Sequence, residues 1–168
     1  MSDTRTPNTI FFVILALGVL DGVHRFPMLP ERMASHFGAS GAPSGWMTKE
    51  QFFITYALVL IPALVVEFFV GKRISRKGDA RISLPNKEYW LAPERREETF
   101  AYFRRFFAWY GSALLALLVY VMGLTLRANL DVEPHLPTTP TITAIVLFVA
   151  YNIAAVVLML RHFQNPKQ

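Results

Sequence analysis

Histidine and acidic side chains are the groups in this chain that could do chemistry, but their spacing matches no known site. The four histidines (His24, His36, His135 and His162) are far apart and follow no metal-binding pattern such as H-E-x-x-H. The absence of cysteine excludes disulfides, thiol catalysis and Cys-ligated metals. The chain has no G-x-S-x-G, P-loop or dinucleotide-binding glycine pattern. We therefore expect no enzyme, no catalytic residue, no metal ligand and no cofactor.

The composition indicates a chain dissolved largely in lipid. Of 168 residues, 53% are hydrophobic and only 17% are charged, and the mean hydropathy is +0.33. A soluble domain carries about 25% charged residues. Four apolar segments, at about 9–26, 52–70, 106–126 and 142–160, approach or reach the roughly 20 residues that cross a bilayer core. We predict an all-α, integral membrane four-helix bundle, with residues 1–168 forming a single membrane domain.

The first segment is the shortest of the four and has an alternative reading. Short apolar runs near an N-terminus are also found in cleaved signal peptides. The residues before it are weakly basic, with one Arg and one Asp, and no A-x-A cleavage pattern follows. These features favour a membrane span.

Basic residues predict the orientation of the four spans. The connection 71–105 holds ten Lys and Arg side chains and five acidic ones. Because basic loops stay on the cytoplasmic side, we predict a cytoplasmic 71–105 loop, both termini in the cytoplasm and an extracytoplasmic loop at 27–50. We expect the bilayer as partner, with anionic lipid at the basic loop. A basic loop beside a membrane span is seldom a nucleic-acid site, so we expect no nucleic acid.

Two polar side chains fall at membrane depth. Glu67 is about one turn from the inner end of the second segment, near Lys72 and Arg73. It reads as a carboxylate that snorkels to the interface or, less favoured, as part of a buried relay. Asn152 lies near the middle of the fourth segment, where an Asn commonly bonds to a neighbouring helix.

The connections also carry local signals. Pro30 could begin a short helix over Pro30–Phe37, and Pro93 could begin a helix that continues into the third span. Phe100, Phe103 and Phe107 recur at helical spacing. This stripe could dip towards acyl chains or pack on neighbouring helices, and the sequence does not separate the two.

The first connection resembles a known family. In LPERMASHFGASGAPSGWMTKE, residues 29–50, a set of eleven positions matches the pattern of the DUF1648 family of small bacterial membrane domains. Those positions are Leu29, Pro30, Arg32, His36, Phe37, Gly41, Pro43, Gly45, Trp46, Thr48 and Lys49. Ser44 departs from it, because family members often have an acidic or amide residue there. LPNKEYWLAPERREET, residues 84–99, also resembles stand-alone members.

The resemblance implies a bacterial inner-membrane protein of unknown biochemistry, and a relation to the N-terminal part of Sdp-type toxin immunity and signalling proteins. Sdp-type proteins have additional spans, so their activity does not transfer. The residues that carry the match make the 27–50 loop the candidate binding surface, through Arg32, His36, Phe37, Trp46 and Lys49. We expect this loop to bind or sense a ligand or protein partner.

Two weaker alternatives remain open. One is a subunit of a small homo-oligomeric transporter or channel lined by Glu67 or Asn152. The other is a membrane enzyme with a metal held by His24, His36 and His135, all on the outer side.

Overall fold

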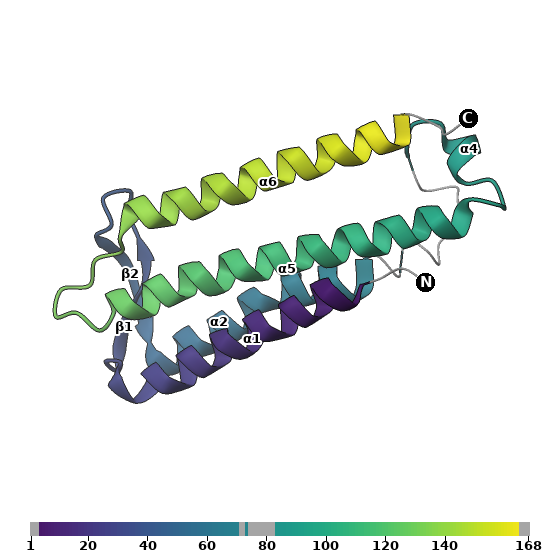
Figure 1. Ribbon diagram of the computed structural model, residues 1–168. Coiled ribbons are helices and arrows are strands. Elements are labelled where there is room, and N and C mark those ends of the chain that lie inside the picture. The colour runs from purple at the N-terminus through teal and green to yellow at the C-terminus, as the bar shows by residue number, and fades with distance from the viewer. Residues whose placement is uncertain (1–3, 71–72, 74–82, 165–168) are drawn as a thin grey trace.

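The computed structural model describes residues 4–70, 73 and 83–164, which form four long helices and one β-hairpin (Figure 1). The first span is α1 (Arg5–Arg25), which ends in a 3-10 turn, η1 (Phe26–Met28). The second is α2 (Lys49–Val65), which continues as a π-helical turn, η2 (Val66–Val70). The third and fourth are α5 (Arg96–Ala128) and α6 (Thr138–Gln164). A short helix, α4 (Lys87–Trp90), precedes α5.

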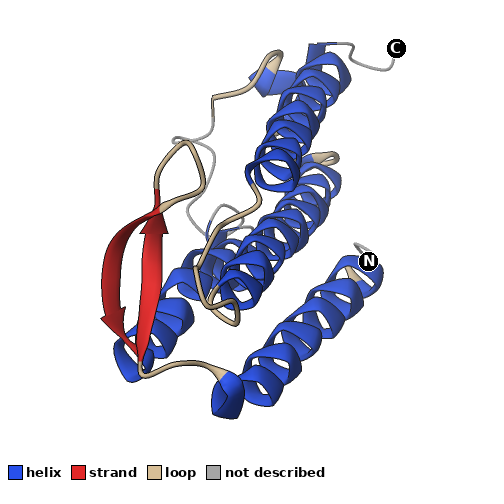
Figure 2. Cartoon of the chain, turned by 90° about the vertical axis from the view of Figure 1, so that its left-hand side faces the viewer, coloured by secondary structure: helices blue, strands red, loops and turns tan. Residues whose placement is uncertain are grey.

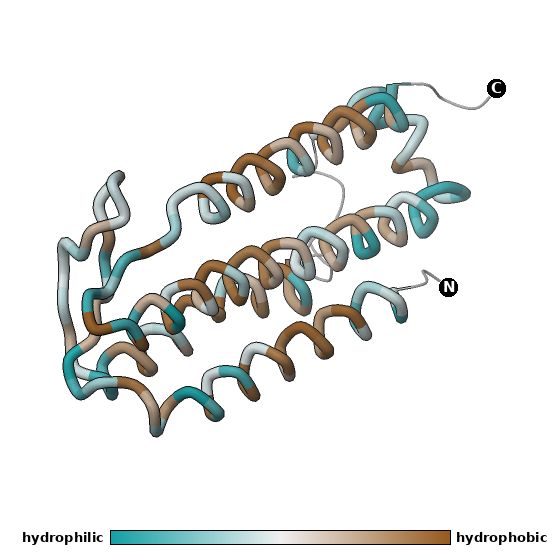
Figure 3. Tube along the Cα trace, turned by 60° about the vertical axis from the view of Figure 1, so that its left-hand side comes forward, coloured by the Kyte–Doolittle hydropathy of each residue, from teal (hydrophilic) through white to brown (hydrophobic). Residues whose placement is uncertain are grey.

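All four helices are long and apolar enough to cross a membrane, which confirms the four predicted spans and the all-α membrane fold. Their most apolar 18-residue windows have mean hydropathies of 1.7, 2.3, 1.8 and 2.5 in chain order. Figure 3 shows the apolar residues along the middle of the helices and the hydrophilic ones towards their ends. The 33 residues of α5 span about 50 Å at 1.5 Å per residue, so α5 is longer than a bilayer core.

Helices α1, α2 and α5 form the packed part of the bundle. Their shared core contains Phe11 from α1, Tyr56, Leu60 and Ala63 from α2, and Leu115 from α5. Gly18 lets α1 approach α5 closely, because a Cβ on Gly18 would lie 2.9 Å from a methyl group of Val119 on α5. Helix α6 runs beside α5 but stands away from α1 and α2 (Figure 1). The start of α1 and the end of α6 lie at the same end of the bundle, opposite the hairpin (Figure 1).

The segment expected as a helix over Pro30–Phe37 is instead a strand, so that prediction is wrong. Strands β1 (Arg32–Phe37) and β2 (Pro43–Thr48) pair antiparallel, with Arg32 opposite Thr48 and Phe37 opposite Pro43 (Figure 2). The tight turn between them uses Gly41 at φ 88°, a conformation that glycine adopts readily. Pairing across this turn satisfies backbone groups that a helix of eight residues would leave largely open at its ends.

An aromatic cluster joins α4, α5 and α6 at the end of the bundle away from the hairpin. Trp90, Phe100, Phe103 and Phe163 are at most 8% exposed and pack together. The described structure therefore favours helix packing over lipid contact for Phe100 and Phe103. The helix expected from about Pro93 begins at Arg96, after a turn. Residues 71–72 and 74–82 of the basic loop lie outside the described residues, so the predicted anionic-lipid contact is not placed.

Candidate functional site

The hairpin and the connection 129–137 join into one structure, which we call the cap. Asn129 follows the end of α5 and is 1% exposed. Its Oδ1 accepts a hydrogen bond from Ala34 N at 2.6 Å, and its Nδ2 donates to Ala34 O at 2.9 Å and to Thr125 O at 2.9 Å. The side chain thus pairs with β1 as a neighbouring strand would. A buried amide with these partners fixes the hairpin to the end of α5.

A second junction forms at the hairpin turn. Leu136 N donates to Gly41 O at 2.9 Å, so the connection 129–137 reaches the tip of the hairpin. A Cβ on Gly41 would collide with Leu136 O and would lie 2.7 Å from His135 Nε2. The loops between α1 and α2 and between α5 and α6 are therefore held together at one end of the bundle.

Lys49 supports the base of the cap and is 8% exposed. Its Nζ donates to Glu31 Oε1 at 3.0 Å and to Leu29 O at 3.3 Å, and lies 4.9 Å from the centre of the Phe26 ring. Thr48 and Gln51 begin α2 with a capping box beside it. All these contacts are internal, so this predicted binding residue positions the hairpin on α2.

Arg32 and Trp46 come together over a crevice between the hairpin and the connection 129–137. The Arg32 guanidinium carbon lies 5.8 Å from the centre of the Trp46 ring, a cation–π distance. The crevice has a volume of about 370 Å³, and Asn129 and Asp131 line it from the other side. Apolar side chains complete the lining: Met28, Leu29, Pro30, Leu130, Val132 and Pro134. Met28, Trp46 and Val132 are at least 45% exposed. The crevice thus offers one cation, one carboxylate and an apolar, aromatic rim.

His36 and Phe37 lie outside that crevice. His36 is exposed, stands opposite Gly45 and has its Nδ1 3.0 Å from Ser35 Oγ. Phe37 ends β1 opposite Pro43. Among the described residues, no group of three or more His, Cys, Asp or Glu side chains could hold a metal ion. Of the five loop residues predicted to bind, Arg32 and Trp46 are therefore the two that lie together at the crevice.

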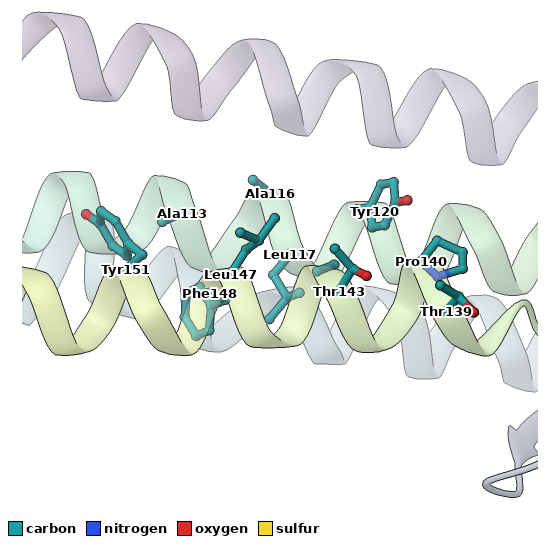
Figure 4. A pocket seen from close by; sticks show the side chains of 11 residues that line it. Ala113, Ala116, Leu117, Tyr120, Thr139, Pro140, Thr143, Leu147, Phe148 and Tyr151 are labelled. Atoms are coloured by element: carbon teal, nitrogen blue, oxygen red, sulfur yellow. The ribbon is translucent and has the colours of Figure 1, made fainter.

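A second crevice runs between α5 and α6 at membrane depth (Figure 4). Its volume is about 690 Å³. Ala113 and Ala116 line it from α5, and Leu147 and Phe148 line it from α6. Hydroxyl groups enter the lining from Tyr120, Thr139, Thr143 and Tyr151. The small alanine side chains do not fill the space between α5 and α6 here.

The two intramembrane polar residues have different settings. Asn152 donates to Phe148 O of its own helix at 2.6 Å, and is half-buried. Glu67 lies in η2, where one carboxylate oxygen is buried against α5 and the other faces Asn8 of α1. Glu67 forms no ion pair with Arg73 in the described structure, and Lys72 lies outside the described residues. The carboxyl group points into the packed bundle.

Sequence reasoning missed two joining residues. The sequence does contain a signal for Asn129, because an Asn directly after a long apolar helix commonly marks the end of that helix. Asn86 is the other: at φ 51° its Nδ2 donates to Phe163 O and Gln164 O, and Trp90 Nε1 also donates to Phe163 O at 2.8 Å. These bonds satisfy carbonyls at the end of α6. The 84–99 segment thus holds α6 in place.

Comparison with known proteins gives one match. Residues 11–64 match the family described as Domain of unknown function (DUF1648). The match covers about a third of the chain, from α1 through the hairpin into α2. No curated protein and no solved structure matches the chain. The relation to Sdp-type proteins stays a prediction. The resemblance of this chain to the DUF1648 family is thus confirmed, over residues 11–64.

Proposed function

We propose that this multi-pass membrane protein is not an enzyme and binds an amphipathic ligand or partner segment in the crevice of the cap. The observation that carries the proposal is the placement of Arg32 beside Trp46 in a crevice that Asp131 and exposed apolar side chains also line. Residues from two loops far apart in sequence line this crevice. Its volume falls within the roughly 300–1,000 Å³ of small-ligand sites. We place the cap outside the bacterial inner membrane and both termini in the cytoplasm, on the charge distribution.

The ligand's chemistry follows from the lining. The Arg32 guanidinium suits a carboxylate or phosphate group, and the Trp46 ring with its apolar neighbours suits an apolar side chain or short hydrocarbon. The buried Asn129 amide is already used within the protein, so it positions the crevice floor. We therefore expect an acidic group beside an apolar group to bind best.

The test is binding of the detergent-solubilised full chain to a panel of short acidic-apolar peptides. We expect Arg32→Ala and Trp46→Ala each to weaken binding at least about tenfold, because aromatic and Arg anchors dominate small interfaces. His36→Ala is the matched control on the same hairpin and should bind as the native chain does. Equal losses in all three variants, or no loss in the first two, would contradict the proposal.

A second candidate function is a subunit of a small oligomeric transporter. It is favoured by the carboxyl group of Glu67 inside the bundle, since ionisable groups at membrane depth commonly mark transport pathways. Asn152 gives less support, because it bonds to its own helix. Flux into vesicles, together with a detergent-corrected mass above that of one chain, would support this candidate. A monomer with no flux would contradict it.

A further inference from the structure

Glu67 has one oxygen with a partner and one without. The Asn8 amide satisfies both neighbouring acceptors when its nitrogen faces them, with Nδ2 2.9 Å from Glu67 Oε1 and 2.8 Å from Thr4 O. Glu67 Oε2 is fully buried and has no hydrogen-bond partner in the described structure. The carboxyl group is therefore held by α1 on one side and is unsatisfied on the other.

The unsatisfied oxygen rests against the backbone of α5. A Cβ built on Gly111 would lie 2.5 Å from Glu67 Oε2 and 3.1 Å from both Cα and Cβ of Glu67. Only a glycine at 111 leaves room for the carboxyl group in this position. The neighbouring hydroxyl of Ser112 lies 3.0 Å from both Ala108 O and Pro7 O, so its hydrogen is already used.

Within residues 4–70, 73 and 83–164, no charged side chain forms an ion pair with Glu67. The described basic side chains towards this end of α1, η2 and α5 include Arg5 on α1, Arg73 after η2, and Arg104 and Arg105 on α5. Arg104 pairs with Glu97 at 2.6 Å, and none of the four forms an ion pair with Glu67 in the described structure. The side chain sits in a π-helical turn, a local geometry that often marks functional positions.

We propose that Glu67 is a proton-binding site inside the α1–α2–α5 bundle. A carboxylate with an unpaired, buried oxygen loses the solvation of a full charge, whereas a carboxylic acid loses a single hydrogen bond. The proton therefore resides on Oε2, and Oε1 remains the acceptor for Asn8. Uptake transfers one proton from water to Oε2 and leaves the group neutral. The site is independent of the cap, which lies at the other end of the bundle (Figure 1).

The first test is labelling of the solubilised full chain with dicyclohexylcarbodiimide, which adds to protonated carboxyl groups in apolar surroundings. The acid's proton moves to a carbodiimide nitrogen, its oxygen bonds to the central carbon, and rearrangement gives a stable acylurea. We expect peptide mapping to find the adduct on Glu67, decreasing as the pH is raised, and not on the exposed Glu50 or Glu98. Absence of the adduct at every pH would overturn the proposal. So would protection by sodium ions, which would assign a cation in place of the proton.

The second test is thermal unfolding of Glu67→Gln, a neutral side chain of the same shape. If Glu67 holds a proton, the native chain loses stability as the pH rises and the proton is lost. The variant should then fold, melt near the native temperature at low pH and lack that pH dependence. Failure of Glu67→Gln to fold, or the same pH dependence in both chains, would overturn the proposal.

Discussion

Among the four long helices, the one with the most apolar 18-residue window is also the least packed. The most apolar 18-residue window of α6 has a mean hydropathy of 2.5, yet none of that window is buried, and Phe163 is the single buried residue of α6. The corresponding window of α5 has a lower mean hydropathy of 1.8, and α5 contributes ten buried residues, among them Gly111, Ser112 and Thr125. The comparison teaches that apolarity in a membrane protein marks contact with lipid, while small and polar residues mark contact between helices.

The α1–α2–α5 unit and helix α6 are also held in place by different contacts. The α1–α2–α5 unit is closed by an apolar core and by polar contacts at both ends, through Asn129 at the cap and Asn8 at the opposite end. Helix α6 is attached at its C-terminal end by an aromatic cluster and by Asn86 and Trp90. Along part of the rest of its length, a crevice lies between α6 and α5. Substitutions that weaken each attachment should therefore have distinct effects.

The largest effect is expected at the attachment of α6. Phe163→Ala removes a ring that stacks on Phe103 and contacts Trp90, and should cost about 3 kcal/mol of unfolding free energy. Leu158→Ala on the same helix is the control, because its side chain is 63% exposed, and it should change stability by less than about 0.5 kcal/mol. Unfolding in SDS–detergent mixtures measures both. Equal effects would show that α6 is held along its whole length.

The second effect is expected at the cap. Asn129→Ala leaves the buried N–H and C=O of Ala34 without partners and should cost about 2 kcal/mol. Asn152→Ala, which removes a bond within a single helix, should cost no more than about 0.6 kcal/mol. The same unfolding assay ranks them, and a larger loss for Asn152→Ala would contradict the assigned role of Asn129.

The third prediction compares two glycines of α5, whose replacement by alanine should change the stability of the protein in different directions. Gly111→Ala forces a methyl group against Glu67 and should destabilise the protein by about 1 kcal/mol. At Gly123 the nearest atom to an added Cβ is Asp21 Oδ2 at 3.9 Å, so Gly123→Ala should be neutral or stabilising by up to about 1 kcal/mol, from helix propensity. Thermal melting compares the two. If Gly123→Ala were destabilised and Gly111→Ala were unaffected, the result would contradict the packing described for η2.

The sequence predicted the spans because a run of about 20 apolar residues has few other structures available to it. It also predicted the region where the helix of the third span begins, from the Pro and Glu residues around 93–98. It did not predict the hairpin, because the 27–50 connection is rich in Pro and Gly and strand pairing depends on a turn geometry that several loop types share.

Side-chain direction was the main limit for the candidate site. Lys49 and Trp46 are three residues apart, yet Lys49 turns inward to Glu31 and Trp46 turns outward over the crevice. Glu67 was interpreted foremost as reaching the membrane surface, whereas its carboxyl group lies against Gly111. Such directions depend on residues distant in sequence, as Ala34 and Asn129 illustrate, and periodicity within one segment does not report them.

The central claim is that the chain crosses the membrane four times and that the loops after α1 and after α5 form one cap on one side. The chain has no cysteine, so Ser40→Cys, Glu133→Cys and Glu98→Cys each provide a single exposed thiol. A membrane-impermeant maleimide applied to intact cells tests the claim most directly. We predict labelling of the variants at positions 40 and 133 in intact cells, and of the variant at 98 only after permeabilisation. Labelling of positions 40 and 133 from opposite sides of the membrane would contradict the account.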